Sequence, residues 1–380
     1  MKVLIALTYY YPHWTGLTAY AQRLAEGLAQ RGHQITVVTS RFRKDLPLRE
    51  EHNGVQIVRL PTWFRLSRGQ VMPSFLSTVN RLVREHDIVQ VHTPMLETWF
   101  VGLLAHWAGR KMVMTHHGDL VMPAGLWNQF VQKTVGFLLD RGADVADVIT
   151  IHSQDYANHS DYLRPRAHKV VAIYPPVVIP KPDQEAVVAW RRELGLEGAK
   201  IVGFAGRFVE EKGFDYLLKA VPLVVERVPN VKFLYAGEHR VVYEDFFGQW
   251  RHLWEANAEH LMMLGLITDR QKLANFYAMC DVFALPSRTD CFPSVQIEAM
   301  FCGTPVVATN IPGAREVVSV TGMGLLVEPR NEQALAEGLV QVLEDPARYI
   351  KPYTHIRSIF DLEKTLSEYE QLLERLAGQN

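Results

Sequence analysis

The chain has 380 residues, of which 48% are hydrophobic and 21% charged, a balance that is typical of soluble globular proteins and excludes disordered and fibrous classes. At roughly 100–200 residues per domain, this length predicts two domains. Lys and Arg number 40 and Asp and Glu 41, and the net charge of −1 argues against a protein that binds nucleic acid over a broad basic face.

Along the first 180 residues, short apolar runs of strand type alternate with helical patterns. A helix is predicted at 17–28, between strands at 3–7 and 35–39. Further strands are predicted at 55–60, 88–91, 111–115, 147–151 and 169–173. This alternation is typical of parallel βαβ units with helices on both faces of a sheet.

A proline-rich segment then interrupts the pattern. Four prolines lie within residues 175–182, and they can continue neither a helix nor a central strand. We interpret this segment as a linker and place the domain boundary there, giving an N-terminal domain of residues 1–180 and a C-terminal domain of residues 181–355.

The alternation resumes after the linker. Strands are predicted at 200–205, 231–236, 260–264, 281–285, 305–308 and 324–327, and helices at 213–227, 243–258, 269–280, 294–302 and 331–343. A last helix, within about 356–380, carries an apolar stripe that needs a cover, and we expect it to pack back on the N-terminal domain. The predicted fold class is therefore α/β, with two tandem doubly wound domains facing each other across a cleft.

Cysteine content and the first residues indicate the compartment. Three cysteines (Cys280, Cys291 and Cys302) cannot form a disulfide framework, which favours a reducing environment. The first apolar run is too short for a signal peptide or a membrane span. We therefore expect a cytoplasmic protein.

Basic residues are concentrated in the first half. Residues 1–180 hold 19 Lys and Arg against 13 Asp and Glu, whereas residues 181–380 hold 21 against 28. Residues 62–84 also mix aromatic side chains with arginines. A peripheral contact with the inner membrane face would explain both features. The alternatives are a chance asymmetry and ordinary helix packing.

The loop after the strand at 200–205 has the residues of a phosphate site. Gly206 to Gly213 link this strand to a helix N-terminus, where anions are favoured. Arg207 and Lys212 would place two cations beside a diphosphate. The alternative is a solvated loop in which they pair with Glu210 or Glu211.

A second group follows the strand at 281–285. Asp290 precedes a helix opened by Phe292, Pro293 and Ser294, whose free backbone N–H groups could bind a ligand. Glu298 lies among apolar residues, so its carboxylate needs partners. Ribose hydroxyls would serve, and a buried structural ion pair is the alternative.

The N-terminal half offers a glycine loop and several histidines. Gly16 could present a close N–H at a helix N-terminus, although the dinucleotide motif G-x-G-x-x-G is absent. His116, His117 and Asp119 follow a strand, but successive side chains point to opposite sides, so we favour one cleft-facing histidine over a metal site. His92 has a similar position and is equally well explained as structural.

Taken together, these motifs resemble the retaining glycosyltransferases of family 4, which have the GT-B fold of two Rossmann-like domains. The resemblance covers nearly the whole chain. It includes Arg31-Gly32-His33, the Thr-x-His-Gly segment that ends at Gly118, the Gly206–Gly213 loop, the acidic pair Asp290 and Glu298, and the run from Gly303 to Ala308.

The resemblance implies roles for the residues in the donor site. Arg207 and Lys212 would bind the diphosphate together with the N–H of Gly16, and Glu298 would bind the ribose. Asp290 and the following Phe292, Pro293 and Ser294 would meet the sugar, and His117 would contact its reacting side. The catalytic residues would then be His117, Asp290, Arg207 and Lys212.

Two positions depart from the family pattern. Asp290 stands where the family usually has Glu, which is one methylene longer. Leu17 stands where a second glycine is common. The first departure affects the reach to the sugar, and the second affects the loop conformation or the choice of acceptor.

The expected activity is retaining transfer of a hexosyl group from a UDP- or GDP-linked sugar to an acceptor hydroxyl, in glycolipid, polysaccharide or glycoconjugate synthesis. Cations and helix N-termini can stabilise a departing diphosphate, and no Asp-x-Asp metal motif occurs, so we expect no cofactor and no obligatory metal. The acceptor, a lipid-linked or soluble glycan, stays open. The alternatives are a nucleotide-sugar epimerase and a non-catalytic nucleotide-sugar-binding protein.

Overall fold

The computed structural model describes residues 1–66, 69–119, 126–241 and 244–379. The chain forms two compact units: unit 1 is Met1–Pro176 with Leu362–Asn380, and unit 2 is Val177–Asp361. The chain therefore passes from the first unit to the second within the predicted linker, after Pro176 instead of residue 180. It returns at Leu362, later than the predicted start at about 356.

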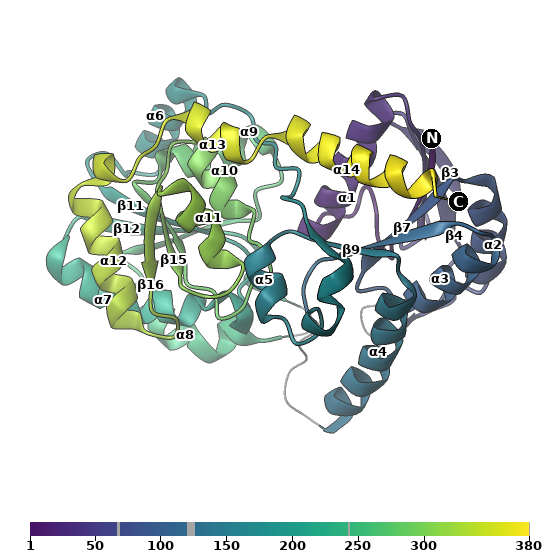
Figure 1. The fold of residues 1–380 in the computed structure, drawn as a ribbon. Coiled ribbons are helices and arrows are strands. Elements are labelled where there is room, and N and C mark those ends of the chain that lie inside the picture. Colours follow the sequence, from purple (N-terminus) through teal and green to yellow (C-terminus); the bar gives the residue numbers. More distant parts are fainter. Residues whose placement is uncertain (67–68, 120–125, 242–243, 380) are drawn as a thin grey trace. The chain divides into compact units, whose positions relative to one another are not determined.

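Unit 1 is built on an eight-stranded sheet in the order β10-β9-β8-β7-β1-β2-β4-β3 (Figure 1). All neighbours pair in parallel except β3 and β4. The strands are β1 (Lys2–Ala6), β2 (Gln34–Ser40), β3 (Arg49–His52), β4 (Val55–Leu60), β7 (Ile88–Thr93), β8 (Lys111–His116), β9 (Val148–Ile151) and β10 (Val170–Ala172). A separate short hairpin joins β5 (Arg65–Leu66) and β6 (Gly69–Gln70).

Helices cover the faces of this sheet. They are α1 (Gly16–Gln30), α2 (Phe75–Glu85), α3 (Thr98–Trp107), α4 (Leu126–Val145), α5 (Gln154–His159) and α14 (Leu362–Ala377), with a 3-10 turn at Arg164–Lys169. Within unit 1, the sequence patterns gave bounds for α1 and α14 but not for α2, α3, α4 or α5, and they did not predict β3. Helix α3 is apolar over most of its surface, which weakens the 3.6-residue period, and the charged strand β3 lies at the sheet edge.

Unit 2 has a six-stranded parallel sheet in the order β13-β12-β11-β14-β15-β16. Its strands are β11 (Lys200–Ala205), β12 (Val231–Ala236), β13 (Leu261–Gly265), β14 (Val282–Leu285), β15 (Val306–Thr309) and β16 (Gly324–Val327). Its helices are α6 (Gln184–Glu193), α7 (Phe214–Arg227), α8 (Phe246–Ala256), α9 (Arg270–Met279), α10 (Val295–Phe301), α11 (Ala314–Thr321), α12 (Glu332–Glu344) and α13 (Tyr353–Ile359), with 3-10 turns at Glu210–Lys212 and Pro346–Arg348.

Both sheets confirm the predicted doubly wound α/β class. Each reverses its strand order beside its first strand, between β1 and β7 in unit 1 and between β11 and β14 in unit 2. At such a point the connections leave the sheet in opposite directions, so the loops after the two strands diverge and leave room for a ligand. The predicted phosphate loop and the Asp290 loop follow β11 and β14.

Helix α14 completes the core of unit 1, where it lies along α1 (Figure 1). Leu373 is fully buried, and the hydroxyls of Tyr20 and Tyr369 lie 2.5 Å apart. A Cβ added to Gly27 on α1 would lie 2.6 Å from Leu366, so a glycine there lets the two helices approach closely. The apolar stripe that the sequence predicted is therefore covered.

Polar contacts of the residues that follow α1 also hold α14 in place. The Arg31 guanidinium donates to the Glu370 carboxylate at 2.8 Å and to the Glu363 carboxylate at 2.7 Å. His33 lies 2.7 Å from Glu370, which gives it a structural role in the turn after α1. These contacts set the register of α14 on α1.

The substitution Leu373→Ala should destabilise unit 1 by about 2–5 kcal/mol, because it removes buried methyl groups and leaves a cavity. The exposed Gln371→Ala on the same helix should change the free energy of unfolding by less than about 0.5 kcal/mol. Urea unfolding followed by tryptophan fluorescence measures both. Equal effects would show that α14 does not belong to the core.

Candidate functional site

The predicted phosphate loop of unit 2 has a constrained backbone. It leaves β11 at Gly206, forms a 3-10 turn over Glu210–Lys212 and enters α7 through Gly213. Gly213 has a φ of 64°, and a Cβ there would lie 2.0 Å from the Pro286 carbonyl oxygen. Only glycine allows this conformation and this contact with the segment after β14.

Two of the predicted site residues meet across the point where the strand order reverses. Lys212 Nζ donates to Asp290 Oδ2 at 2.5 Å, and the two side chains are 22% and 11% exposed. Glu211 Oε1 lies 3.2 Å from Arg207 Nη2 and 3.9 Å from Lys212 Nζ. Four charged side chains therefore form a continuous series, and the surface ion pair that the sequence left open is one part of it.

The protonation state of Lys212 follows from these neighbours. Burial alone would lower the pKa of its ammonium group, but the carboxylates of Asp290 and Glu211 outweigh burial and raise the pKa. Lys212 is therefore a fixed cation at neutral pH, as charge stabilisation of a phosphate requires.

In the segment after Asp290, most side chains are buried, so backbone groups are the better candidates for binding a ligand. Asp290 forms a parallel bridge with Gly313, and a Cβ on that glycine would lie 2.1 Å from the Cys291 carbonyl oxygen. The side chains of Phe292 and Pro293 are buried and Ser294 is half-buried. Helix α10 begins at Val295, so the predicted helix at 294–302 is confirmed to within a residue at each end.

Glu298 has protein partners on α9. Its Oε1 accepts from Arg270 at 3.2 Å, and its Oε2 accepts from the Tyr277 hydroxyl at 3.1 Å. The buried ion pair that the sequence left open as an alternative is thus present. Any ribose hydroxyl bound to Glu298 would share the carboxylate with these groups.

In unit 1, three histidines at the carboxyl ends of neighbouring strands form one hydrogen-bonded series. His92 Nδ1 lies 2.9 Å from His117 Nε2, and His117 Nδ1 lies 3.1 Å from His152 Nε2. His92 and His152 are buried, and His117 is half-buried. The ring of Tyr20 packs edge-on against His117, with 4.9 Å between centroids. Both ring nitrogens of His117 are therefore engaged within the unit.

The three imidazoles are held neutral. Burial is the main cause, and it lowers the pKa of His92 and of His152 to about 3 and that of His117 well below its usual value. A neutral imidazole donates from one nitrogen and accepts at the other. The series therefore requires the same tautomer in all three rings, either Nδ1–H throughout or Nε2–H throughout.

His116 points away from this series, as the alternation along a strand predicted. Its Nε2 lies 3.0 Å from Asp119 Oδ1, and its Nδ1 lies 3.2 Å from the Thr93 hydroxyl. The Asp119 carboxylate also accepts from the Ser160 hydroxyl at 2.9 Å. His116 and His117 thus belong to two separate networks.

Gly16 begins α1 directly after its capping residue. Thr15 and Thr18 form a reciprocal capping box. Gly16 is exposed, and a Cβ added there would meet nothing within 4 Å. The fold of unit 1 therefore has room for a larger residue at this position.

A different group of residues has the spacing of metal ligands. Among the residues that the structure describes, His33, Glu370 and Glu374 are the group whose ligand atoms lie within 4.8 Å of one another. Glu370 already pairs with His33 and Arg31 in the contacts that fix α14. We assign this group a structural role.

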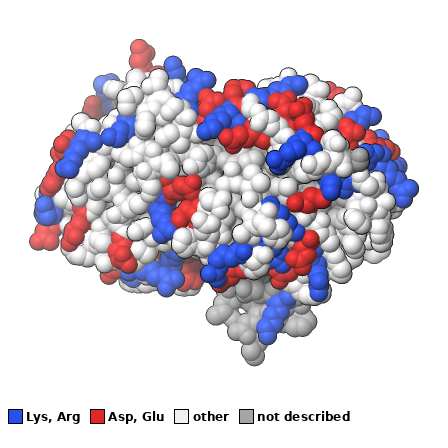
Figure 2. All heavy atoms as spheres, viewed as in Figure 1, with Lys and Arg blue, Asp and Glu red and all other residues white. Residues whose placement is uncertain are grey.

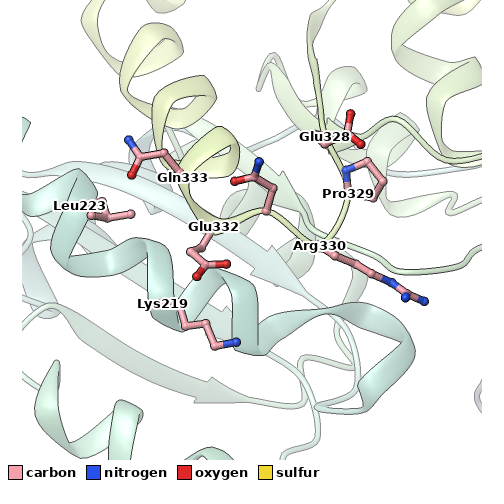
Figure 3. Close-up of a pocket in the computed structure, with 8 residues that line it drawn as sticks. Lys219, Leu223, Glu328, Pro329, Arg330, Glu332 and Gln333 are labelled. Carbon is pink, nitrogen blue, oxygen red and sulfur yellow. The ribbon is translucent and has the colours of Figure 1, made fainter.

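A cavity of unit 2 lies apart from the predicted site. It has a volume of about 610 Å³ and lies between α7 and the start of α12 (Figure 3). Its lining is Lys219, Leu223, Glu328, Pro329, Arg330, Asn331, Glu332 and Gln333. None of the predicted site residues lines this cavity, so its volume gives no reason to place the donor site there.

Several residues that the sequence did not single out belong to these networks. His152 directly follows β9, as His117 directly follows β8, and His92 is the last residue but one of β7. This position at a strand end could have identified His152 from the sequence. Arg270 and Tyr277 bind Glu298 from α9, which is distant in sequence. No local pattern predicts such a pair.

Comparison with known proteins extends over both units. Residues 188–357 match the family described as glycosyl transferases group 1, and residues 15–176 match the glycosyl transferase 4-like domain. The two matches fall on units 2 and 1.

Individual proteins resemble the chain over almost its full length. An uncharacterized glycosyltransferase of Methanocaldococcus jannaschii is 28% identical, covering 91% of this chain and 90% of that protein. A GDP-mannose-dependent phosphatidylinositol monomannoside mannosyltransferase of Mycolicibacterium smegmatis is 29% identical over 89% and 88%. The crystal structure of HepE from Anabaena in complex with UDP and glucose has a TM-score of 0.78 at 21% identity, over 99% of this chain and 100% of that one.

Acid should destabilise unit 1 through the histidine series. In the unfolded chain each of His92, His117 and His152 binds a proton near its ordinary pKa of about 6.5, whereas in the folded unit it does not. Stability is therefore lost as pH falls below about 6.5, at up to about 1.4 kcal/mol per pH unit for each histidine. Urea unfolding from pH 7 to pH 4.5 measures this slope.

In the variant His152→Gln, the free energy of unfolding should fall less steeply with decreasing pH, because one fewer proton is taken up on unfolding. The exposed His106→Gln on α3 serves as the control and should keep the slope of the parent protein. If both variants matched the parent, the series would not be held neutral.

Proposed function

The chain belongs to the glycosyl transferases group 1 family of GT-B glycosyltransferases, and from this premise we propose that it moves a hexosyl group from a UDP- or GDP-linked sugar to an acceptor hydroxyl with retention of anomeric configuration. The observation that carries the proposal is the Lys212–Asp290 contact at 2.5 Å, where the loops after β11 and β14 meet. One similar protein is a GDP-mannose-dependent mannosyltransferase and another has been solved with UDP and glucose, so donors with either base should be tested.

The charges of unit 2 suit a departing nucleoside diphosphate. Glycosyl transfer passes through an oxocarbenium-like state while negative charge grows on the leaving group. Arg207 and Lys212 provide fixed positive charge on one loop, and fixed charges need no reorganisation as the bond breaks. Such a leaving group needs no general acid, and we propose that transfer proceeds without a metal ion.

The two carboxylates have different surroundings and should have different roles. Asp290 contacts Lys212 and can turn to the sugar once a diphosphate takes over that ammonium group. Glu298 is held by Arg270 and Tyr277 and is suited to a fixed contact with ribose. In unit 1, the neutral histidine series would hold His117 in place beside the reacting sugar, and Gly16 would offer its N–H to the diphosphate.

Two other functions use the same residues differently. A nucleotide-sugar epimerase would convert the donor in the absence of an acceptor, and a non-catalytic binding protein would leave it unchanged. Incubation of UDP- and GDP-sugars with and without acceptor, followed by proton NMR, distinguishes both from a transferase. NMR also reads the anomeric configuration of the product, and EDTA tests the independence from metal.

Substitution of the cations should separate chemistry from folding. Arg207→Met and Lys212→Met should each lower turnover by about 10²–10³-fold, because each removes charge that stabilises the leaving group. Asp290→Asn should chiefly lower turnover, whereas Glu298→Gln should chiefly weaken nucleotide binding. Calorimetry with UDP and GDP, run beside rate measurements, gives both quantities.

Lys232→Met is the matched control, because this lysine lies on β12 and donates to the Glu259 carbonyl at 2.6 Å, away from the proposed diphosphate loop. It should retain normal turnover. Near-normal rates in both cation variants would contradict the phosphate role. Equal losses of nucleotide affinity in Asp290→Asn and Glu298→Gln would contradict the division of roles.

For the acceptor, we propose a lipid-linked molecule that unit 1 binds through exposed aromatic side chains. Trp63 is 76% exposed and Phe64 56%, while Phe75 on α2 is buried. Residues 62–84 therefore contain both exposed aromatic side chains and an aromatic side chain that packs in the core. Arg68 of this segment lies outside the described residues. A pocket of about 250 Å³ with a mainly apolar lining lies beside the β5–β6 hairpin, between β6, α2 and Phe100 of α3.

On the face shown in Figure 2, Lys and Arg side chains lie among Asp and Glu side chains. In the described part of the chain, no helix combines the length and apolar character needed to cross a bilayer. A surface contact through aromatic side chains is consistent with both observations.

Vesicle binding tests the lipid proposal. The protein should sediment with vesicles of phosphatidylglycerol and phosphatidylcholine at low salt, and less with 0.5 M salt, because exposed charges are then screened. Trp63→Ala should weaken sedimentation, whereas Tyr353→Ala, an exposed aromatic control in unit 2, should not. Absence of binding at low salt would leave a soluble glycan as the acceptor.

A further inference from the structure

Arg288, three residues beyond β14, holds the turn that carries Lys212. Its backbone N–H donates to the Glu211 carbonyl at 2.8 Å, and its Nη1 donates to the Glu210 carbonyl at 2.5 Å. These are the two residues directly before Lys212. One residue of the β14 loop therefore fixes the backbone of the β11 loop at adjacent carbonyls, through its backbone N–H at Glu211 and its side chain at Glu210.

The other arm of Arg288 is anchored on α7. Its Nη2 donates to Asp215 Oδ2 at 2.8 Å, and the Asp215 side chain is only 1% exposed. Lys219 Nζ lies 3.8 Å from the same oxygen. Burial raises the pKa of the Asp215 carboxyl, and the charges of Arg288 and Lys219 oppose that rise. A buried carboxylate with these partners is a firm attachment point.

Aromatic rings fix the plane of the guanidinium. The Arg288 Cζ lies 4.8 Å from the Tyr216 ring centroid and 5.6 Å from that of Phe246. A planar guanidinium can stack on rings and donate in two directions at once, which an ammonium group cannot do. Arg288 is 14% exposed, so its charge is largely turned toward the protein.

We propose that Arg288, attached to Asp215, is a positioning residue that sets Lys212 at the correct place for the diphosphate. The two loops are joined twice: by Arg288 to the turn backbone, and by Lys212 to Asp290 two residues further on. The second contact must loosen when a phosphate takes the Lys212 ammonium group. The first contact does not depend on the ligand and keeps the turn in place. This inference rests on the proposed function.

The test measures affinity for UDP, GDP and their monophosphates by calorimetry at 15 °C. Arg288→Met should raise the Kd of the diphosphate by about tenfold or more, because a small displacement of a charged group strongly weakens its contact. The Kd of the monophosphate should change little, since Lys212 is expected at the second phosphate. Arg227→Met, which removes an exposed ion pair with Glu344, is the control and should change neither.

A double substitution separates positioning from direct contact. In a Lys212→Met background, Arg288→Met should add less than about twofold to the Kd, because it acts through a side chain that is already absent. Additive losses would mean that Arg288 binds the phosphate itself and would overturn the inference. A lower melting temperature with unchanged Kd values would show a purely structural role and would also overturn it.

Conservative variants keep the test valid if Arg288→Met fails to fold. Arg288→Lys retains a cation beside Asp215 but cannot also reach the Glu210 carbonyl, so it should restore thermal stability without restoring diphosphate affinity. Full recovery of affinity in Arg288→Lys would contradict the inference. If the parent protein binds neither UDP nor GDP, the proposed function fails, whereas binding that depends on Lys212 but not on Arg288 refutes only this inference.

Discussion

Parallel pairing of β11 with β14 is the constraint on which the candidate site depends. Because the strands run in the same direction, their carboxyl ends lie at one edge of the sheet, and because the strand order reverses there, the following loops diverge. The loop after β11 supplies Arg207 and Lys212, and the loop after β14 supplies Arg288 and Asp290. Gly213 permits their contact, since any side chain there would collide with the Pro286 carbonyl.

The charge network of unit 2 neutralises its cations with carboxylates of the same unit. Two cations close together on one loop would repel each other, and Glu211 and Asp290 compensate them. An anionic ligand would replace these carboxylates at the ammonium and guanidinium groups. Under the proposed function, binding would exchange one ionic partner of these cations for another. Unit 1 instead keeps its buried imidazoles uncharged.

Sequence patterns predicted most of the fold because its strands are short apolar runs and its helices are amphipathic. The α/β class, the strands of both sheets other than β3, and the covered stripe on residues 362–376 all follow from local periodicity. Helix α3 was not predicted because it is apolar on most sides, which weakens its period. Strand β3 was not predicted because it is charged and lies at a sheet edge. The family was identified from a set of motifs and their spacing, and several of these motifs lie close to the ends of strands.

The side-chain partners within the site could not be predicted in the same way. Arg270 and Tyr277 reach Glu298 from another helix, and Arg288 reaches Asp215 across 73 positions of sequence. Such pairs depend on the packing of helices on the sheet, which no local pattern specifies. The sequence offered ribose or an ion pair for Glu298, and the geometry supplies the ion pair. Likewise, the sequence left open whether His92 is structural or faces the cleft. In the structure His92 is buried and hydrogen-bonded to His117, so it supports the histidine that was expected to face the cleft.

The return of α14 to unit 1 has a consequence for synthesis on the ribosome. Unit 2 is one uninterrupted segment, whereas the core of unit 1 is incomplete until residues 362–377 have been made. Domains made from contiguous segments can fold as they emerge. The sheet of unit 1 must therefore wait, with the surface of α1 that receives Leu366 uncovered, while the whole of unit 2 is translated. The first part of the chain to be made is the last to be finished.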